Sequence, residues 1–293
     1  EIPSRKNRFC PVFTVIVATI YIYRKVWIMP QYTFSDNYRE NIEYFDKLFG
    51  IGKNYDIISR EQLVAGHSVH FYYIDSFMNT PLLERLFIYL AELDKVKVDD
   101  IRAFAAEHLP YTQVMPTSDA SQFVDMIMSG TMGMIVDGLD GGIIIDTRTY
   151  PSRSVSQSEN DRVLRGAHDS FIETVKMNST MIRRRIRDPR LTFERFSVGR
   201  SSKSDVVLCY INGRADDDYV KLLRDKLSNI KVDALTLGQE SLAECLVRRR
   251  WYNPFPIFRY TERPDVAAAH VLEGSVIILC DTSPEAMILP TCL

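Results

Sequence analysis

The sequence of 293 residues lacks the features that would place it in several large classes of protein. It has no excess of positive charge, since its formal net charge is -2, whereas a protein that binds nucleic acid over its whole surface is normally basic. It has no Cys-x-x-Cys pair, so we expect no metal site of that type. It also has no run of the about 20 apolar residues that a membrane-spanning helix needs. We therefore expect no nucleic-acid partner, no metal and no membrane span within this chain.

Cysteine is scarce, and its spacing shows no pairing. The five cysteines form an odd count, and no two of them are close in the chain. Cys209 and Cys280 lie within apolar runs, where a free thiol behaves as a small hydrophobic side chain. This pattern argues against a disulfide framework and favours a reducing compartment.

The N-terminal residues allow three interpretations. Three cations within residues 5–8 precede an uncharged stretch over residues 11–23, in the order of a signal peptide, but no small-residue cleavage site follows. The stretch is also shorter than the ~20 apolar residues of a membrane anchor. A start of translation at Met29 would make the earlier residues non-native. We favour this interpretation over a leader or an anchor for residues 1–28.

The composition is that of a folded chain long enough for two domains. Hydrophobic residues make up 46% and charged residues 25% of the chain, which suffices for ordinary hydrophobic cores. Domains commonly hold roughly 100–200 residues. The clearest change of composition begins at Tyr150-Pro151 and continues through four serines up to residue 158. We therefore predict two domains, residues 29–150 and residues 151–293, joined by a Ser-rich linker.

Helices and strands are predicted to alternate in both halves. In the first half we expect helices over residues 32–49, from Thr80, over 98–108 and from Ser118, a strand over 68–75, and a hairpin over 132–145. In the second half we expect helices over 170–187, from Asp216, over 241–247 and 265–272, and strands over 191–198, 205–211, 231–237, 275–280 and 287–289. This alternation predicts an α/β fold of two lobes, each a mixed sheet flanked by helices. No internal repeat is apparent.

The candidate catalytic and metal-binding patterns have simpler interpretations. His67 and His70 could share a metal on a helix, but the local pattern is that of a strand, where this spacing places them on opposite faces. The adjacent His168, Asp169 and Ser170 suit a helix N-terminus better than a catalytic triad, whose members are rarely neighbours in sequence. We expect no catalytic residue and no cofactor, and therefore no enzyme.

One polar loop and two arginine clusters remain. The loop over residues 199–204 ends in Lys-Ser like a phosphate-binding loop, but it lacks the glycines of that loop. A hairpin turn that touches an anion weakly at most is favoured. The arginines within residues 183–187 and 248–250 close helices, where cations contribute about 0.3–1 kcal/mol each. A structural role and a role in docking a partner protein or a lipid headgroup both remain open for them.

A series of short motifs runs through the second half of the chain. The motifs are Arg162-Val163-Leu164-Arg165-Gly166, Asp169, Phe171, Glu173, Asn178, Arg183-Arg184-Arg185-Ile186, Val198-Gly199-Arg200, Ser202-Lys203, Thr261-Glu262-Arg263-Pro264-Asp265, Leu272-Glu273-Gly274 and Ile288-Leu289-Pro290-Thr291. In this order and spacing they resemble the signature of the GerA-type A subunits of spore germination. The resemblance is dense from about residue 144 to residue 291. The sequence departs from the family pattern at residues 156–160, His168 and Ser170.

The resemblance implies a role in nutrient-triggered germination. Proteins of this family are receptor and channel subunits of the spore inner membrane, and they continue into several transmembrane helices after the equivalent of Pro290-Thr291. This chain would then be a head on the cytoplasmic side of that membrane, attached through a C-terminal domain that the sequence does not include. The implied partners are other membrane subunits of a germination complex, whose state the head would couple to the release of ions or solutes.

Eight residues are predicted to dock partners or to connect the two lobes. They are Arg165, Asp169, Asn178, Arg183, Arg184, Arg185, Arg200 and Lys203. The alternative function is a module that binds a small nutrient molecule between the lobes. An enzyme that acts on phosphate-bearing small molecules near Lys203 is a third and less favoured interpretation.

Overall fold

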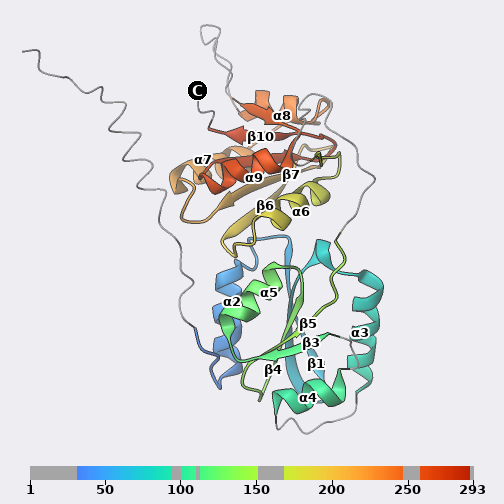
Figure 1. Cartoon of the computed structure of the whole chain (residues 1–293). Helices are drawn as coiled ribbons and strands as arrows, with labels where there is room; N and C mark the ends of the chain where they lie inside the picture. Colours follow the sequence, from blue (N-terminus) through green and yellow to red (C-terminus); the bar gives the residue numbers. More distant parts are fainter. Residues whose placement is uncertain (1–31, 94–99, 110–112, 151–167, 247–257, 291–293) are drawn as a thin grey trace, which may run out of the picture. The chain divides into compact units, whose positions relative to one another are not determined.

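The computed structural model describes residues 32–93, 100–109, 113–150, 168–246 and 258–290 (Figure 1). Three subjects of the predictions lie outside the described residues: residues 1–28, for which a non-native extension was favoured over a leader, the linker and boundary after residue 150, and the arginines at 248–250. The described residues form two five-stranded sheets that are flanked by helices. The prediction of an α/β fold with two lobes is confirmed.

The first lobe is a five-stranded sheet with helices on both faces. Its elements are α2 (Tyr38–Phe49), β1 (Ile57–Val64), β2 (His67–Ile74), η1 (Asp75–Phe77), α3 (Thr80–Glu92), α4 (Ile101–His108), β3 (Val114–Thr117), α5 (Ala120–Met128), β4 (Met132–Val136) and β5 (Gly142–Ile145). The strand order is β1-β2-β4-β5-β3. Successive side chains of β2 point to opposite faces: the Tyr72 hydroxyl donates to Asp46 of α2 at 2.9 Å, while the Phe71 ring contacts Phe87 of α3.

Most helices of both lobes begin at a capping residue. Asn37, Asn79, Asp100, Asp119 and Asp216 each accept a hydrogen bond from a backbone N–H of the first turn. Such caps satisfy N–H groups that have no partner within the helix, and each contributes about 0.5–2 kcal/mol. The predicted cap at Ser118-Asp119 is confirmed at Asp119.

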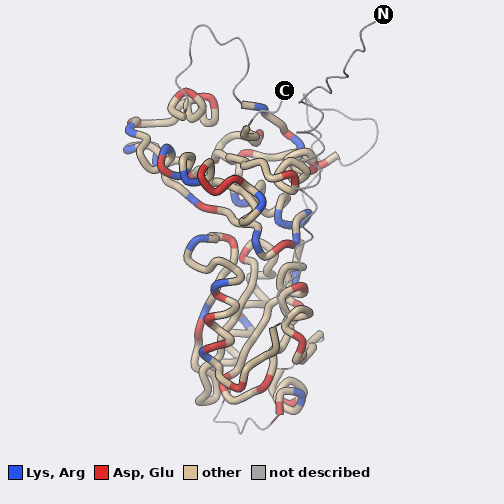
Figure 2. The backbone as a smooth tube through the Cα atoms, turned by 90° about the vertical axis from the view of Figure 1, so that its left-hand side faces the viewer, with Lys and Arg blue, Asp and Glu red and all other residues tan. Residues whose placement is uncertain are grey.

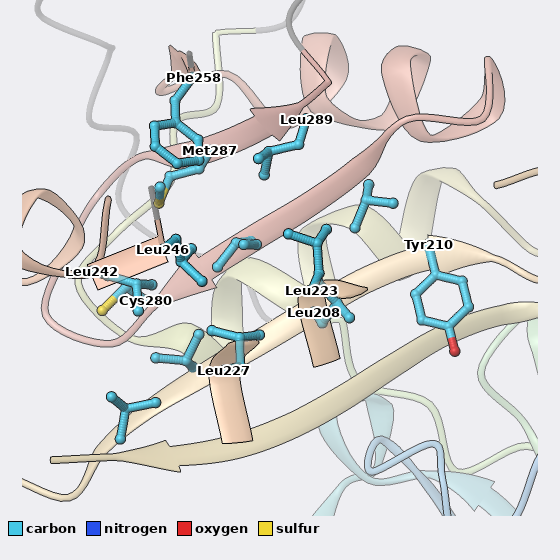
Figure 3. Packing of buried hydrophobic residues seen from close by; sticks show 14 of the residues in the cluster. Leu208, Tyr210, Leu223, Leu227, Leu242, Leu246, Phe258, Cys280, Met287 and Leu289 are labelled. Carbon is cyan, nitrogen blue, oxygen red and sulfur yellow. The ribbon is translucent and has the colours of Figure 1, made fainter. Parts of the chain in front are cut away.

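The second lobe repeats this architecture. Its elements are α6 (Val175–Arg185), β6 (Leu191–Val198), β7 (Ser204–Ile211), α7 (Asp217–Ser228), α8 (Gln239–Leu246), β8 (Arg259–Thr261), α9 (Pro264–Leu272), β9 (Val276–Cys280) and β10 (Ala286–Leu289). Its strand order is β6-β7-β9-β10-β8. One face of the sheet packs against α7 and α8 through residues such as Leu208, Leu223 and Leu242 (Figure 3). The other face packs against α6 and α9 through Cys209 and Val271 among others.

Apart from the short η1 of the first lobe, the two lobes have the same order of helices and strands and the same sheet topology. Each described lobe runs helix, two strands, two helices, strand, helix and two strands, and the two sheet orders become identical when the strands are renumbered from one. The paired strands also have matching lengths, for example eight residues in both β2 and β7 and five in both β4 and β9. The sequence did not reveal this internal repeat.

Three predictions of local structure are corrected. All strand pairs among the described residues are antiparallel rather than mixed, because each sheet is built around hairpins such as β1–β2 and β6–β7. Helix α6 begins at Val175 rather than at residue 170, where the Ser170 hydroxyl instead donates to the Glu262 carbonyl. Residues 231–237 form no strand.

Candidate functional site

The edge of the second sheet is covered by a segment from the first lobe. Strand β6 ends its sheet, and residues 53–56, which connect α2 to β1, lie against it. The Asn54 side chain accepts from the Phe193 N–H at 2.9 Å and donates to the Leu191 carbonyl at 3.1 Å. The Tyr55 N–H donates to the Phe193 carbonyl at 3.1 Å. These bonds satisfy strand groups that would otherwise be open at a sheet edge.

A buried ion pair fixes this segment to α6. Arg183 is 0% exposed, and its Nε donates to Asp56 Oδ2 at 2.8 Å. Its Nη2 donates to Asp56 Oδ1 at 3.2 Å and to the Leu191 carbonyl at 2.8 Å, and its Nη1 donates to the Asp188 carbonyl at 3.2 Å. The planar guanidinium thus uses its fixed geometry to bind both lobes at once. We call residues 53–56 together with their contacts to α6 and β6 the joint.

Apolar and polar neighbours shield the joint from water. The Arg183 guanidinium lies 5.0 Å from the centre of the Phe193 ring. The Tyr55 hydroxyl donates to Ser179 Oγ at 2.7 Å, and burial raises the pKa of Tyr55 above its ordinary value. Burial also raises the pKa of the Cys209 thiol, and the nearby Arg183 charge does not offset this. Both side chains are therefore neutral packing residues.

Two further contacts surround the joint at the surface. Lys176 at the start of α6 pairs with Asp75 of η1 at 2.5 Å. The Arg184 guanidinium lies 4.8 Å from the centre of the Tyr150 ring, a cation–π contact. Exposed contacts of this kind contribute little individually, about 0–1 kcal/mol. Their contribution to the free energy of unfolding is therefore small, and their main effect is on the orientation of the side chains around the joint.

Lys53 connects residues 53–56 to a further charged residue, Glu194 of β6. It lies 3.4 Å from Glu194, a carboxylate of β6 that also accepts from Arg224 at 2.7 Å and from the Tyr210 hydroxyl. Burial alone would raise the pKa of the Glu194 carboxyl, but the hydrogen bonds from Arg224 and Tyr210 outweigh it and hold the pKa below its usual range. Glu194 is therefore ionised and attracts Lys53 to the edge of β6.

The structure brings some of the predicted residues together and separates others. Asp169 accepts from Arg185 at 2.6 and 2.5 Å, beside α6. The Asn178 side chain accepts from the Ile172 N–H at 2.8 Å and donates to the Ile172 carbonyl, so that it holds the segment before α6. With Arg183 and Arg184, these residues all belong to α6 or its approach.

The remaining predicted residues lie elsewhere. Arg200 and Lys203 are exposed in the turn between β6 and β7, and Lys203 has a positive φ of 44°. Arg165 lies outside the described residues. No group of three or more His, Cys, Asp or Glu side chains suited to a metal ion occurs in the part of the chain that the structure describes.

Sequence reasoning missed the partners of Arg183. Asp56 and Asn54 stand in a short polar stretch between a helix and a strand, and nothing local distinguishes them from ordinary loop residues. Asp56 lies 127 positions before Arg183 in the sequence. The only available signal was the need of several adjacent arginines for carboxylate partners.

Lys and Arg are interspersed with Asp and Glu over both lobes (Figure 2), which agrees with the small net charge. In the described ranges, no helix combines the length and the apolar character needed to cross a membrane. The fold and the joint together define a two-lobed α/β domain in which one lobe completes the sheet edge of the other.

Comparison with known proteins identifies the family. The model of the family described as "Bacillus/Clostridium GerA spore germination protein" matches residues 43–293, and the chain belongs to this family. The chain is 38% identical over 259 residues to stage V sporulation protein AF of Bacillus subtilis (strain 168). This alignment covers 88% of this chain and 52% of the relative. It is 25% identical over 267 residues to spore germination protein A1 of the same organism, covering 90% of this chain and 54% of the relative. The chain thus spans about half the length of the curated relatives that it matches.

A solved structure has the same fold. It is the crystal structure of the N-terminal domain of the A subunit of the Bacillus megaterium spore germinant receptor GerK3. The TM-score is 0.68 at 26% sequence identity, and the match covers 90% of this chain and 98% of that domain. The resemblance read from the sequence motifs is confirmed.

Proposed function

We propose that this chain is the head region of a spore-germination protein of the A-subunit type. In this proposal it catalyses no reaction, docks with partner subunits and couples them to the release of ions or small solutes. The observation that carries the proposal is the match to the N-terminal domain of a germinant-receptor A subunit, of which the chain covers 98%. Because a fold alone does not define a function, the family match over residues 43–293 is needed as independent support.

We also propose that the protein is attached to the spore inner membrane through a part that this chain does not include, with the head on the cytoplasmic side. About half of each relative lies outside the aligned region. Another relative, 29% identical over 188 residues, is named an uncharacterized membrane protein, YfkQ of Bacillus subtilis. The described cysteines 209, 245 and 280 are free thiols, which fits a reducing compartment.

The exposed cations among the predicted residues are the proposed docking residues. Arg200 and Lys203 stand on a turn whose backbone is held in place, since the Arg200 N–H donates to the Val232 carbonyl at 3.0 Å. Because the backbone of the turn is already ordered, binding adds only the cost of ordering the two side chains, which favours recognition of an acidic partner surface. The predicted residues on α6 and its approach have partners within the chain. Arg183 belongs to the joint, whereas Asn178 and the pair of Asp169 with Arg185 hold the approach to α6.

Charge reversal in the full-length protein tests this docking role. Arg200→Glu combined with Lys203→Glu is expected to reduce co-purification with partner subunits and to slow ion release during germination, with an unchanged unfolding midpoint. Lys221→Glu, on the exposed side of α7, is the matched control and should leave both readouts unchanged. Normal assembly and release in the double variant would contradict the docking role. Normal germination in spores that lack the whole gene would contradict the proposed function itself.

A further inference from the structure

Helix α6 lacks a capping side chain of its own. Thr174 occupies the N-cap position, and its side chain makes no capping hydrogen bond. The Val175 N–H instead donates to Asp281 Oδ1 at 3.0 Å. Asp281 follows β9, 106 positions later in the chain, so the cap of α6 comes from the turn between β9 and β10. The corresponding helix of the first lobe, α2, is capped by its own Asn37.

The turn that supplies the cap is bound at several points. The Asp281 N–H donates to the Asp205 carbonyl at 2.9 Å. The Thr282 N–H donates to the Glu173 carbonyl at 2.7 Å, just before α6. Thr282 adopts a positive φ of 66°, which is unfavourable for a β-branched residue and persists only where surrounding contacts impose it. The turn and the start of α6 are thus built as one unit, while Thr282 and Pro284 remain exposed.

Two charged contacts of α6 lead to the first lobe. Lys176, next to the capped residue, pairs with Asp75, and Arg183 near the end of the helix pairs with Asp56. Val175 and Arg183 are eight residues apart, or about 12 Å along a helix that rises ~1.5 Å per residue. A rigid helix of this length therefore connects the β9–β10 turn directly to the first lobe.

We propose that Asp281 is a positioning residue that couples the β9–β10 turn to the joint. A displacement of the exposed turn would shift or release the cap, and α6 would carry that change to Asp75 and Asp56. This inference rests on the proposed function, because it assigns the route by which the head responds to a partner. A helix held at both ends by contacts from different parts of the fold can transmit such a displacement, provided that the two ends are energetically coupled.

Amide hydrogen exchange on the whole chain tests the coupling. Losing a cap weakens a helix by about 0.5–2 kcal/mol, so Asp281→Ala is expected to speed exchange in the first turn of α6 by roughly two- to thirty-fold. The coupling predicts faster exchange also at two amides of the joint, those of Tyr55 and Asp75, which bind the Phe193 and Asp56 carbonyls. Asp281→Asn retains an acceptor oxygen and should restore slow exchange at the joint.

A matched control separates coupling from loss of a cap. Asp216 is the N-cap of α7, and its carboxylate accepts a hydrogen bond from the Tyr219 N–H at 2.9 Å. Asp216→Ala removes this cap and should leave the exchange rates of the Tyr55 and Asp75 amides unchanged. Faster exchange confined to the first turn of α6 in the Asp281→Ala chain would overturn the coupling. This experiment does not depend on spores. If it succeeds while deletion of the gene leaves germination normal, the coupling stands and the proposed function falls.

Discussion

At one equivalent position in the two cores, the large side chain comes from the helix in the first lobe and from the strand in the second. In the first lobe, Phe123 of α5 packs onto β4 at Gly133, where an added Cβ would lie 2.6 Å from the Phe123 ring. In the second lobe the equivalent positions, counted from the starts of elements of equal length, are Ala267 of α9 and Ile277 of β9. The large side chain has moved from the helix to the strand. Total volume and polarity are kept while the residues change, as close packing requires.

A second difference lies at the sheet edges. Strands β1 and β6 occupy the same edge of their respective sheets. Among the residues that the structure describes, only β6 receives a segment from the other lobe, residues 53–56, through Asn54 and the pair of Asp56 with Arg183. The two lobes therefore place equivalent edges in different surroundings, and the joint is one place where their structures differ.

Breaking the joint gives the largest expected effect. Arg183→Met leaves Asp56 as a buried carboxylate without its cation, and such losses cost about 3–5 kcal/mol. We expect a correspondingly lower free energy of unfolding in chemical denaturation. The double variant Arg183→Met with Asp56→Leu removes both charges and should recover most of the loss. A double variant no more stable than Arg183→Met would show that Asp56 is not the partner that matters.

A substitution at Gly133, in the core of the first lobe, is expected to give the next largest loss of stability. Gly133→Ala places a methyl group 2.5 Å from Ile127 and 2.6 Å from Phe123, and overpacking of this kind costs about 1–3 kcal/mol. Unfolding by denaturant measures the loss. In a chain that already carries Phe123→Ala, part of the space is open, so Gly133→Ala should cost much less there. Additive effects of the two substitutions would contradict the view that these residues share one volume.

Prediction from the sequence succeeded where apolar residues recur along the whole element, and it failed where polar residues interrupt them or where an alternating stretch lies outside a sheet. The predicted strand over residues 191–198 coincides with β6, whose first four residues are buried. Strand β1 was missed because its four central residues, 59–62, are all polar, whereas Phe193 and Phe196 stand on either side of the charged centre of β6. Residues 231–237 alternate like a strand, but their carbonyls accept bonds from the Gly199 turn while Val232 and Leu235 pack into the core.

The candidate site was predictable only in part, for a related reason. The arginines of α6 form a visible cluster, and Arg183 was among the predicted residues. Its partner Asp56 and the edge-binding Asn54 come from a distant segment, and a single sequence contains no local signal for such a contact. The repeat was hidden as well, because pairs such as Phe123 and Ala267 conserve packing without conserving identity.

The smallest effect concerns a histidine that one lobe has and the other lacks. His70 of β2 corresponds to Val207 of β7, counted from the strand starts. Its Nε2 lies 2.6 Å from the Ser59 hydroxyl, which also donates to Asp46 at 3.2 Å. Burial lowers the pKa of His70 below its ordinary value, and the nearby carboxylates of Asp46 and Glu61 oppose this only in part.

The lowered pKa of His70 in the folded state fixes the direction in which stability changes with pH. Folding favours the neutral imidazole, so its contribution to stability is present above the unfolded pKa of about 6.5 and is lost as the pH falls through the folded pKa. His70→Val, which copies the second lobe, should therefore flatten the dependence of the unfolding free energy on pH below about 6.5. His168→Gln, at an exposed position, is the control and should leave the slope unchanged. An identical slope in the His70→Val chain would assign the acid sensitivity of the first lobe to its carboxylates instead.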